Sequence, residues 1–328
     1  MNDKILTISV AAYNIEKYIR DTLDSLIVTE ILSDIEVLVV DDGSTDSTYS
    51  IAKEYEDKYP NVFKAIHKDN GGYGSTVNYS IDNAHGKYFK LLDGDDWFDK
   101  NGFIKLINVL NKSSCDVVLT QFCKVYDDNK IVAIRFDEKQ VRKEIRIDKF
   151  IFNAAVPMHA VTIKTDKLKE SRVKLPEHML YTDNIYAAQS FAYVDTIQCD
   201  NFVVYNYRQG VDGQSVSDRS LTEHIDESIK IAIDLTKFYA DKVSHDMKSR
   251  NYIEMNVAST CVNAIVGILK MKPSKNALNM LKTLDKEIKE LSNDIYIRME
   301  KLDRRASQVL KFIRTTNYLL YWVLVTKV

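Results

Sequence analysis

The chain has 328 residues, of which 45% are hydrophobic, and its formal net charge is −2. This length allows one large domain with an appendage or two modest domains, and the hydrophobic content allows a sizeable core. Because the charge is close to zero, we expect no global basic field and therefore no nucleic-acid partner.

Residues 1 to 100 alternate between strand-like and helix-like segments. Short apolar runs predict strands at Leu6–Ala12, Ile35–Val40, Val62–His67 and Lys87–Leu92. The segments between them have helical spacing: Ile15–Leu26, Ser47–Tyr59 and Gly74–Ala84. This alternation predicts an α/β fold with a parallel sheet covered by helices.

Residues 101 to 218 are predicted to be mixed, and residues 219 to 328 to be helical. The mixed region is expected to contain a helix at Asn101–Asn111, a hairpin of Asp116–Val125 and Lys130–Phe136, a helix at Asp183–Tyr193 and a strand at Thr196–Tyr207. Helical periodicity then covers Ile225–Val243, Tyr252–Leu269, Ser274–Leu302 and Arg305–Val325. The apolar stripe of these helices favours a core within the chain, and a seam between the subunits of a homo-oligomer is the alternative.

The last residues of the sequence, 317 to 328, are apolar and aromatic, and Lys311 and Arg314 precede them. This stretch is too short to span a bilayer. It can pack on the preceding helices, pair with another subunit, or lie on a membrane surface. Packing within the protein or an oligomer is favoured, because such a stretch is rarely left in water.

The cysteines and the first residues of the sequence indicate the cellular compartment in which we expect the protein. The four cysteines have no metal-ligand or redox spacing: Cys115, Cys123, Cys199 and Cys261. The first apolar run, Ile5–Tyr13, is short and is not a signal peptide, and no window contains about 18 apolar residues. We therefore expect a cytoplasmic protein without a membrane-spanning helix, with peripheral contact at the inner face of the membrane as a further option.

Three carboxylates lie within four residues after the strand predicted at Lys87–Leu92: Asp93, Asp95 and Asp96. Acids this close repel one another unless a positive charge lies among them. Oxygen ligands suit a hard divalent cation, Mg²⁺ or Mn²⁺, which commonly shares its coordination with substrate phosphates. The cluster therefore predicts a site for a metal ion and a diphosphate.

Two other predicted strands also end in polar residues. Leu6–Ala12 is followed by Tyr13 and Asn14, and Ile35–Val40 is followed by an acidic turn that contains glycine, Asp41–Thr48. In open α/β sheets, ligands bind outside the carboxyl ends of the strands. We therefore expect a ligand site along this edge of the sheet.

Four segments, in this order, resemble the signature of the family-2 glycosyltransferases: Ile8–Asn14, Val39–Asp46, Asn70–Gly72 and Asp93–Asp96. The resemblance implies the GT-A fold, with a Rossmann-like, mostly parallel sheet, and metal-dependent, inverting sugar transfer of the bacterial surface-polysaccharide or glycoprotein-glycan type. It also implies a nucleotide-sugar-binding half at residues 1–100, an acceptor-binding half at 101–218 and a C-terminal helical region at 219–328.

The resemblance places the nucleotide of the sugar donor beside Ala11, Tyr13 and Asp42. Tyr13 offers an aromatic face for stacking, and a carboxylate can accept the imide N–H of uracil, so the implied donor is a UDP-sugar. The alternative is that the carboxylate accepts from another base. Strand alternation points Asp41 and Asp42 in opposite directions, and we expect Asp42 to face the ligand. The alternative for both acids is turn formation and helix capping.

The resemblance gives the metal chiefly to Asp95. Asp93 is then available to the ribose or to metal-bound water, while Asp96 supports the loop or faces the sugar. The segment that begins with Asn70 and Gly71 lets the backbone pass close to the donor. The alternative for the three acids is a solvated acidic turn.

Inverting transfer needs a base opposite the leaving diphosphate, and the resemblance implies Asp183 for this role. The alternative is that Asp183 is a helix N-cap. His159 and His178 are interpreted as hydrogen-bonding pocket residues, because neither has a sequence partner at metal-ligand spacing. Arg208 is expected to pair with the donor diphosphate or else to be a surface arginine, and residues 209–214 are expected to form a lid.

The sequence thus predicts a hexosyl- or N-acetylhexosaminyltransferase that moves a sugar from a UDP-sugar to a glycan, glycoprotein or lipid-linked acceptor. A sugar nucleotidyltransferase is the first alternative, but Ala11–Asn14 has neither the glycines nor the cations of a triphosphate loop. An inactive glycan-binding or scaffold subunit is the second alternative. Such a subunit would be marked by loss of the carboxylates, which are all present.

Overall fold

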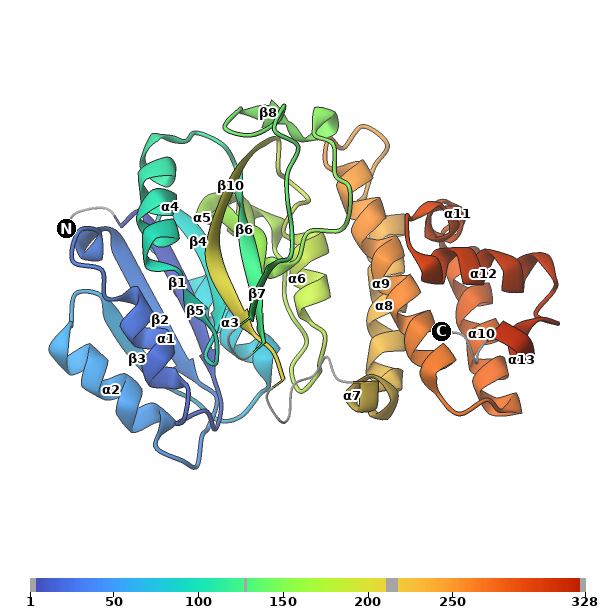
Figure 1. Cartoon of the computed structure of the whole chain (residues 1–328), viewed down its shortest axis with the longest axis horizontal. Helices are drawn as coiled ribbons and strands as arrows, with labels where there is room; N and C mark the ends of the chain where they lie inside the picture. Colours follow the sequence, from blue (N-terminus) through green and yellow to red (C-terminus); the bar gives the residue numbers. More distant parts are fainter. Residues whose placement is uncertain (1–3, 127–128, 211–217, 325–328) are drawn as a thin grey trace. The chain divides into compact units, whose positions relative to one another are not determined.

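The computed structural model describes residues 4–126, 129–210 and 218–324. The chain forms two compact units, and it passes between them several times (Figure 1). The first unit comprises residues 1–150, 157–179 and 193–212, and the second comprises residues 151–156, 180–192 and 213–328. Each unit is described by itself below.

The first unit begins with four parallel strands in the order β3-β2-β1-β4. Their bounds are Leu6–Ala12 for β1, Ile35–Asp41 for β2, Phe63–His67 for β3 and Tyr88–Asp93 for β4. The helices that alternate with them are α1 at Ile19–Leu26, α2 at Thr48–Lys58, α3 at Tyr73–Asn83 and α4 at Lys100–Lys112. The predicted α/β alternation is confirmed for these residues.

The central strands are buried on both faces, which explains their continuous apolar runs. Adjacent residues, whose side chains point to opposite faces, are completely shielded from solvent: Thr7 and Ile8 in β1, and Val39 and Val40 in β2. Burial of an aliphatic side chain of this kind contributes about 1.5–3 kcal/mol, so these strands form the core of the unit. The helix expected from Ile15 begins only at Ile19.

The second half of the sheet is mixed. A short strand that the sequence did not predict, β9 (Val161–Lys164), pairs antiparallel with β4 on one side and with β6 (Val117–Tyr126) on the other. The order then continues through β10 (Thr196–Arg208), which is parallel to β6, to β5 (Trp97–Phe98). The remaining elements of this half are β7 at Asn129–Val132, β8 at Ile145–Arg146 and α5 at Thr165–Ser171.

Strand β10 is irregular in its middle. Its register against β6 shifts between Asp200 and Val203, and again between Val203 and Tyr205. Helix α4 crosses close to this irregular stretch at Gly102, where a Cβ atom would lie 1.7 Å from the carbonyl oxygen of Val203. The shifts set which side chains of the strand's last residues point toward the end of β4.

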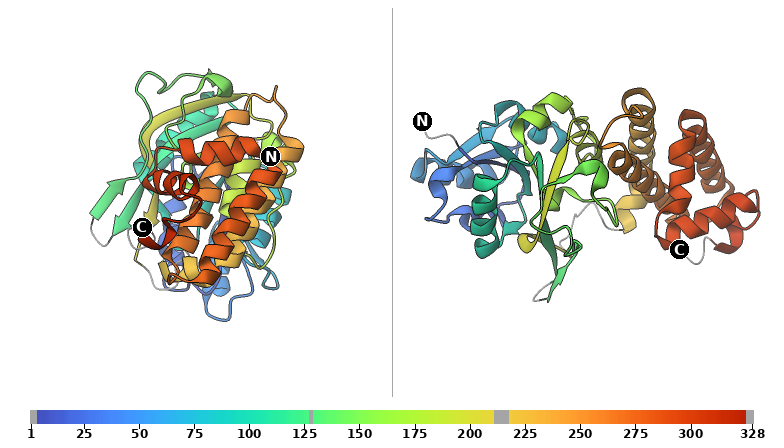
Figure 2. Two further views of the ribbon diagram at one scale, coloured as in Figure 1. Left: turned by 90° about the vertical axis from the view of Figure 1, so that its right-hand side faces the viewer. Right: turned by 90° about the horizontal axis from the view of Figure 1, so that it is seen from above.

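The second unit is helical, and its helices are drawn from yellow-green to red in Figure 2. Its elements are α6 at Asp183–Gln189, α7 at Asp218–Glu223, α8 at Ile225–Lys242, α9 at Arg250–Lys270, α10 at Lys275–Leu291, α11 at Asn293–Lys301, α12 at Arg305–Thr315 and α13 at Tyr321–Leu324. Helix α9 contacts α6, α7, α8, α10, α11 and α12. It is therefore the central helix of this unit.

Among the described residues, α9 is the one helix long and apolar enough to cross a membrane. The sequence analysis did not single out its 18-residue window, because polar residues interrupt the apolar run. However, 78% of this window is buried inside the chain. Because its apolar side chains already pack against neighbouring helices, α9 has the burial of a core helix.

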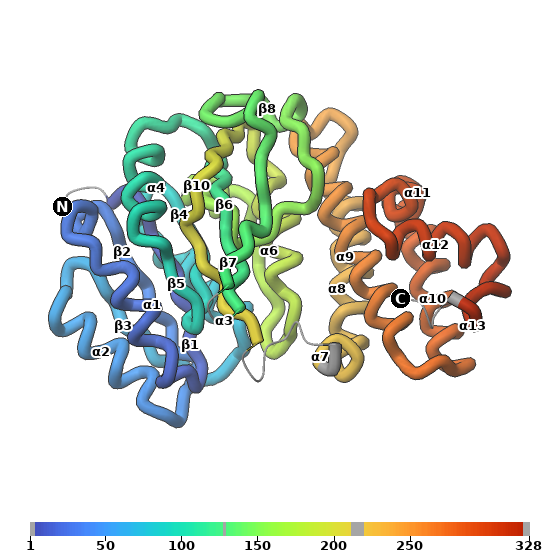
Figure 3. The backbone as a smooth tube through the Cα atoms, viewed as in Figure 1, coloured from blue at the N-terminus to red at the C-terminus, as the bar shows by residue number. Residues whose placement is uncertain are grey.

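Two predicted helices are interrupted. The segment Ser274–Leu302 breaks at Ser292, whose Oγ accepts a hydrogen bond of 3.3 Å from the amide of Ile295 and so caps α11. The segment Arg305–Val325 breaks after Thr315, and Asn317 and Tyr318 adopt φ values of 48° and 65°. Figure 3 shows both turns in the trace of the backbone.

A buried ionic network joins α10, α11 and α12. The guanidinium of Arg314 lies 2.5 Å from a carboxylate oxygen of Asp285 and 3.1 Å from one of Glu300. The hydroxyl of Tyr318 donates to the other oxygen of Asp285 at 2.5 Å. The side chains of Arg314 and Asp285 are only 5% and 1% exposed, so each depends on the other for compensation of its charge.

Candidate functional site

The acidic cluster lies in a tight turn at the end of β4. Asp93 is the last residue of the strand and pairs in register with Ala11 of β1. The amide of Gly94 donates to the carbonyl of Ala11 at 3.0 Å, and a Cβ atom on Gly94 would lie 2.6 Å from that oxygen. The amide of Asp96 then donates to the carbonyl of Asp93 at 3.0 Å. Glycine at position 94 thus allows the turn that gathers the acids.

Asp96 connects this turn to β10. Its carboxylate accepts hydrogen bonds from the Tyr205 hydroxyl at 2.6 Å and from the Arg208 amide at 2.7 Å. The same Tyr205 oxygen accepts from the amide of Asp93 at 3.1 Å. Burial, reinforced by the charges of Asp93 and Asp95, raises the pKa of Asp96 well above its ordinary value. These contacts are those of a residue that supports the loop, one of its two predicted roles.

His159 lies beside the same acids. Its ring stacks against Tyr207 and Phe122, with centroids 4.5 and 5.0 Å away, and meets the edge of Tyr205 at 4.8 Å. Ligand atoms of His159, Asp93 and Asp96 all lie within 4.8 Å of one another. The fold thus brings His159 beside two acids that are distant in the sequence, and its role as a hydrogen-bonding pocket residue stays a prediction.

The donor set fits a divalent cation. Burial, with the charge of Lys90 adding to it, lowers the pKa of His159 to about 3, so the imidazole is neutral and can offer a lone pair. Its Nδ1 is buried and has no hydrogen-bond partner among the described residues. A neutral imidazole with two carboxylates suits Mn²⁺, and the carboxylates alone suit Mg²⁺.

Asp95 and Arg208 flank this set. Burial raises the pKa of the Asp95 carboxyl, and the nearby positive charge of Arg208 opposes that shift. The Arg208 Nε donates to the backbone carbonyl of Asp95 at 2.8 Å, and its guanidinium lies over the rings of Trp97 and Tyr18 at 4.7 and 5.0 Å. The structure thus brings a cation to the acidic cluster, while metal binding by Asp95 stays a prediction.

Lys90 is a buried cation that the sequence analysis missed. It is completely shielded, and its Nζ donates to the carbonyls of His159 at 2.8 Å and Val161 at 3.1 Å. Burial lowers the pKa of this lysine to about 7. Its contacts hold the short turn Met158–Ala160, which carries His159. The sequence feature that could have revealed Lys90 is a single lysine inside an otherwise apolar strand.

Asp42 organises the loop after β3. Its Oδ1 accepts from Lys68 Nζ and the Gly71 amide, both at 2.9 Å, and its Oδ2 accepts from the Gly72 amide at 2.7 Å. The Asn70 side chain donates to the Asp42 carbonyl at 2.9 Å. Gly72 adopts a φ of 79°, which favours glycine. Lys68 was missed from the sequence, and contact of Asp42 with the base stays a prediction.

Asp41 has different partners from Asp42, as strand alternation predicts. Its Oδ2 lies 2.5 Å from Nδ1 of His67 and accepts a 3.3 Å hydrogen bond from the Ser44 amide. Asp41 therefore binds the turn after β2 and the neighbouring strand β3.

Tyr13 and Asn14 follow directly after β1, and both are exposed. The side chain of Asn14 accepts a hydrogen bond of 2.9 Å from the amide of Thr45, which ties the end of β1 to the turn after β2. Tyr13 is 51% exposed, so a large part of its ring is open to solvent. An exposed aromatic face at a strand end is suited to stacking on a planar ligand.

His178 is exposed, and its backbone lies against the glycine loop. Its amide donates to the Gly71 carbonyl at 2.7 Å, and a Cβ atom on Gly72 would lie 3.0 Å from the His178 amide nitrogen. The predicted lid, residues 209–214, lies outside the described residues from position 211 onward.

Asp183 belongs to the second unit, where it is the first residue of α6. Thr182 occupies the N-cap position, so the structure does not bear out the alternative of Asp183 as N-cap. Burial raises the pKa of the Asp183 carboxyl, and hydrogen bonds from nearby backbone amides oppose the shift. The side chain of its neighbour Asn184 accepts from Thr260 of α9 at 3.3 Å.

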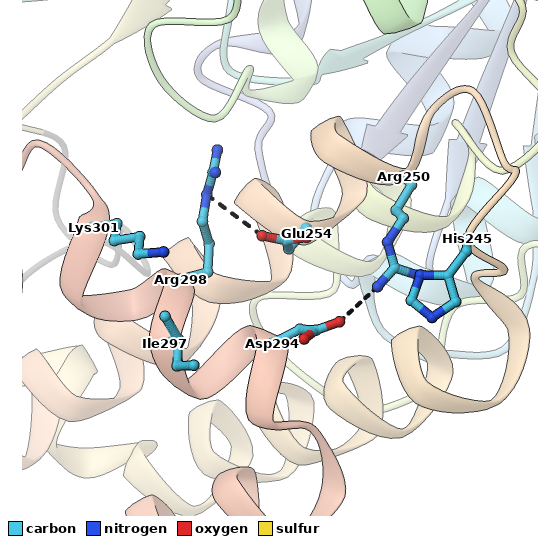
Figure 4. Close-up of a pocket in the computed structure, with 7 residues that line it drawn as sticks. All are labelled: His245, Arg250, Glu254, Asp294, Ile297, Arg298 and Lys301. Carbon is cyan, nitrogen blue, oxygen red and sulfur yellow. Dashed lines mark hydrogen bonds and ion pairs between the residues drawn. The ribbon is translucent and has the colours of Figure 1, made fainter.

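The second unit also contains a polar cavity of about 370 Å³ (Figure 4). It is lined by His245, Arg250, Glu254, Asp294, Ile297, Arg298 and Lys301. Arg250 pairs with Asp294 at 2.6 Å, and Arg298 lies 3.8 Å from Glu254. These pairs link α9 to α11 and offset most of the charge in the cavity.

Comparison with known proteins agrees with the resemblance seen in the sequence. Residues 7–162 match the family described as Glycosyl transferase family 2. An uncharacterized glycosyltransferase of Rickettsia typhi is 29% identical over 208 residues, which are 62% of this chain and 64% of that relative. The chain thus spans less than two thirds of the length of this relative.

Solved structures extend the similarity to nearly the whole chain. S. aureus TarS 1–349, in complex with UDP-GlcNAc, is 19% identical and superposes with a TM-score of 0.71 over 98% of this chain and 92% of that one. The mannosyltransferase PcManGT of Pyrobaculum calidifontis, in complex with GDP-Man and Mn²⁺, is 15% identical with a TM-score of 0.51, over 93% of this chain and 86% of that one. The motifs, the sheet and these similarities agree: residues 7–162 are similar to glycosyl transferase family 2, and the chain has the GT-A fold.

Proposed function

We propose that this chain transfers a sugar from a UDP-sugar to an acceptor hydroxyl with inversion at the anomeric carbon. The observation that carries the proposal is the convergence of Asp93, Asp96, His159 and Arg208 at the end of β4, where the family motif occurs. The complexes of TarS with UDP-GlcNAc and with UDP support a uridine nucleotide as the donor.

On the donor side, each proposed contact uses a group with suitable chemistry. Tyr13 stacks on the base with its exposed ring. Arg208 offers a planar, permanently charged guanidinium to the diphosphate, for which such groups are well suited. Asn70 and Gly71 belong to the loop that Asp42 holds in place, so these residues shape the nucleotide site together.

Asp93, Asp95, Asp96 and His159 are the residues that would hold a divalent cation. When bound, the cation supplies positive charge to the diphosphate that leaves. Asp96 and Tyr205 keep the turn in one conformation through their 2.6 Å hydrogen bond, so the oxygen ligands are arranged before the donor arrives. The PcManGT complex with Mn²⁺ supports manganese as the first ion to test.

Asp183 is the proposed general base. The acceptor oxygen forms a bond to the anomeric carbon while the bond from that carbon to the diphosphate oxygen breaks, and the hydroxyl proton passes to the Asp183 carboxylate. The raised pKa of Asp183 supports this role, because a base works best when its pKa approaches the working pH. A glycan, glycoprotein or lipid-linked hydroxyl is the proposed acceptor.

The test is UDP release from a panel of UDP-sugars, with glucose, galactose and their N-acetylamino forms as the sugars. The wild-type chain is expected to release UDP in the presence of Mn²⁺ and to stop when a chelator is added. Asp95→Asn is expected to lower the metal-dependent rate by about 100-fold or more. Asp57→Asn is the matched control, since that carboxylate is exposed on α2, and its rate is expected to equal the wild-type rate.

Other results would point to the alternatives. Pyrophosphate release from UTP and a sugar phosphate would indicate a nucleotidyltransferase. Binding of UDP-sugars without any release, in both the wild type and Asp95→Asn, would indicate an inactive binding subunit. Either result would refute the proposed transfer.

A further inference from the structure

The C-terminal helices expose a concentrated group of large apolar side chains. We call this group the apolar tip: Phe312, Leu319, Leu320, Trp322 and Val323, with exposed fractions of 62%, 79%, 36%, 47% and 56%. Among the described residues, eleven large apolar side chains are exposed, and five of them fall within residues 312–323. Single exposed apolar residues are ordinary, whereas a group of this kind indicates a surface that binds something.

The apolar tip stands on a well-packed base. Leu310, Ile313 and Tyr321 of the same segment are completely shielded. The ionic network of Arg314 and Asp285 and the hydroxyl of Tyr318 further fix the segment on α10. The exposed side chains therefore belong to a folded element, and the described part of the chain does not cover them.

The charge of the segment that carries the apolar tip indicates which kind of partner binds there. Residues 271–324 contain eleven Lys and Arg against six Asp and Glu, an excess of five positive charges in a chain whose net charge is −2. Lys311 is exposed beside Phe312, and the Lys282 ammonium lies 5.3 Å from the centre of the Tyr318 ring, next to Leu319. Apolar side chains with lysines around them match an anionic surface.

A second copy of the chain fits less well. A symmetric dimer through this face would bring the same lysines of both copies close together, and such like charges oppose association. An anionic lipid surface attracts these lysines and does not repel them. Trp is favoured at the boundary between headgroups and acyl chains, and each Lys near an anionic surface adds electrostatic attraction.

We propose that the apolar tip inserts into the headgroup layer of a membrane that contains anionic lipids, with Lys282 and Lys311 contacting the lipid phosphates. The chain lies on the surface at this point, because α13 (Tyr321–Leu324) is far too short to cross a bilayer. The proposal does not rest on sugar transfer.

The test is co-sedimentation of the full chain with vesicles. The wild type is expected to bind mixed vesicles of phosphatidylcholine and phosphatidylglycerol, less tightly at high salt, and to bind pure phosphatidylcholine weakly. The double variant Leu319→Ser, Trp322→Ser is expected to lose at least tenfold in partitioning, because both apolar side chains that would be buried in the headgroup layer are removed. Lys311→Glu is expected to lose about fivefold or more on the mixed vesicles alone.

Matched controls are available on the same unit. Ile297→Ser removes an apolar side chain that is 41% exposed outside the apolar tip, and Lys237→Glu reverses an exposed charge on α8, outside residues 271–324. Both are expected to bind mixed vesicles like the wild type. Circular dichroism of every variant checks that the fold is retained, which is expected because all the altered side chains are exposed.

Fluorescence gives an independent measurement. The chain has two tryptophans, Trp97 and Trp322, so Trp97→Phe leaves Trp322 as the single reporter. Its emission is expected to shift to shorter wavelength with the mixed vesicles. Equal binding by the double variant, or no binding and no shift with the wild type, would refute the proposal. So would a dimer in light scattering that dissociates in the double variant, since a second copy would then cover the apolar tip.

Discussion

Tyr205 shows how one side chain can organise an entire acidic cluster. Its hydroxyl donates to Asp96 at 2.6 Å and accepts from the Asp93 amide at 3.1 Å, while its ring edge faces His159 at 4.8 Å. Removal of one partner from a buried carboxylate generally costs about 1–3 kcal/mol, so these contacts stabilise the turn substantially. The turn that carries the acidic side chains is therefore held in place by Tyr205.

Asp183 yields a prediction about pH. Its pKa lies above the ordinary value of 3.8 because the carboxyl is buried, and a general base must be ionised to work. The value of kcat/KM for UDP release is therefore expected to fall with decreasing pH at a point above 3.8. Asp183→Asn is expected to lower kcat by about 10²–10⁴-fold and to abolish this acid limb.

The control for Asp183 is Asp226→Asn, which removes an exposed carboxylate of the same unit. This variant is expected to keep both the rate and the pH profile. If Asp183→Asn kept the acid limb at a normal rate, another group would have to be the base.

At the scale of elements, the sequence predicted the first four strands and their helices because each carries its own pattern. Strand β9 has only four residues, and it is defined by long-range pairing with β4 and β6. The break at Ser292 was missed because the apolar periodicity continues from α10 into α11. His159 and Lys90 were not connected because 69 residues separate them in the sequence.

The helices α10 and α12 yield a prediction about stability. Asp285→Ala leaves Arg314 as a buried charge without its main partner, so we expect a loss of about 3–5 kcal/mol in the free energy of unfolding. The double variant Asp285→Leu, Arg314→Met is expected to lose much less, because both charges are removed together. Urea unfolding followed by circular dichroism measures the difference.

The exposed pair of Lys286 and Glu290 is the control on the same helix. Lys286→Ala is expected to change the free energy of unfolding by no more than about 0.5 kcal/mol. A loss in Asp285→Ala no greater than in this control would contradict the stabilising role of the ionic network.

At the scale of the whole molecule, two compact units lead us to expect two unfolding transitions. UDP with Mn²⁺ at 100 times its dissociation constant stabilises the native state by about 2.7 kcal/mol. The transition of the first unit, which contains the proposed nucleotide site, is expected to rise by about 5–10 °C. Differential scanning calorimetry tests this, and a shift confined to the other transition would contradict the assignment of the site.

The helical unit draws its core from distant parts of the chain, and this restricts how the protein can be cut or recombined. Tyr252 of α9 lies 4.0 Å from the ring of Phe191 and 4.7 Å from that of Phe152, and both partners precede β10 in sequence. A truncation after residue 218 would leave those aromatic rings facing water and invite aggregation. Exchange of C-terminal helices between relatives would therefore have to carry the segments around Phe152 and Phe191 as well.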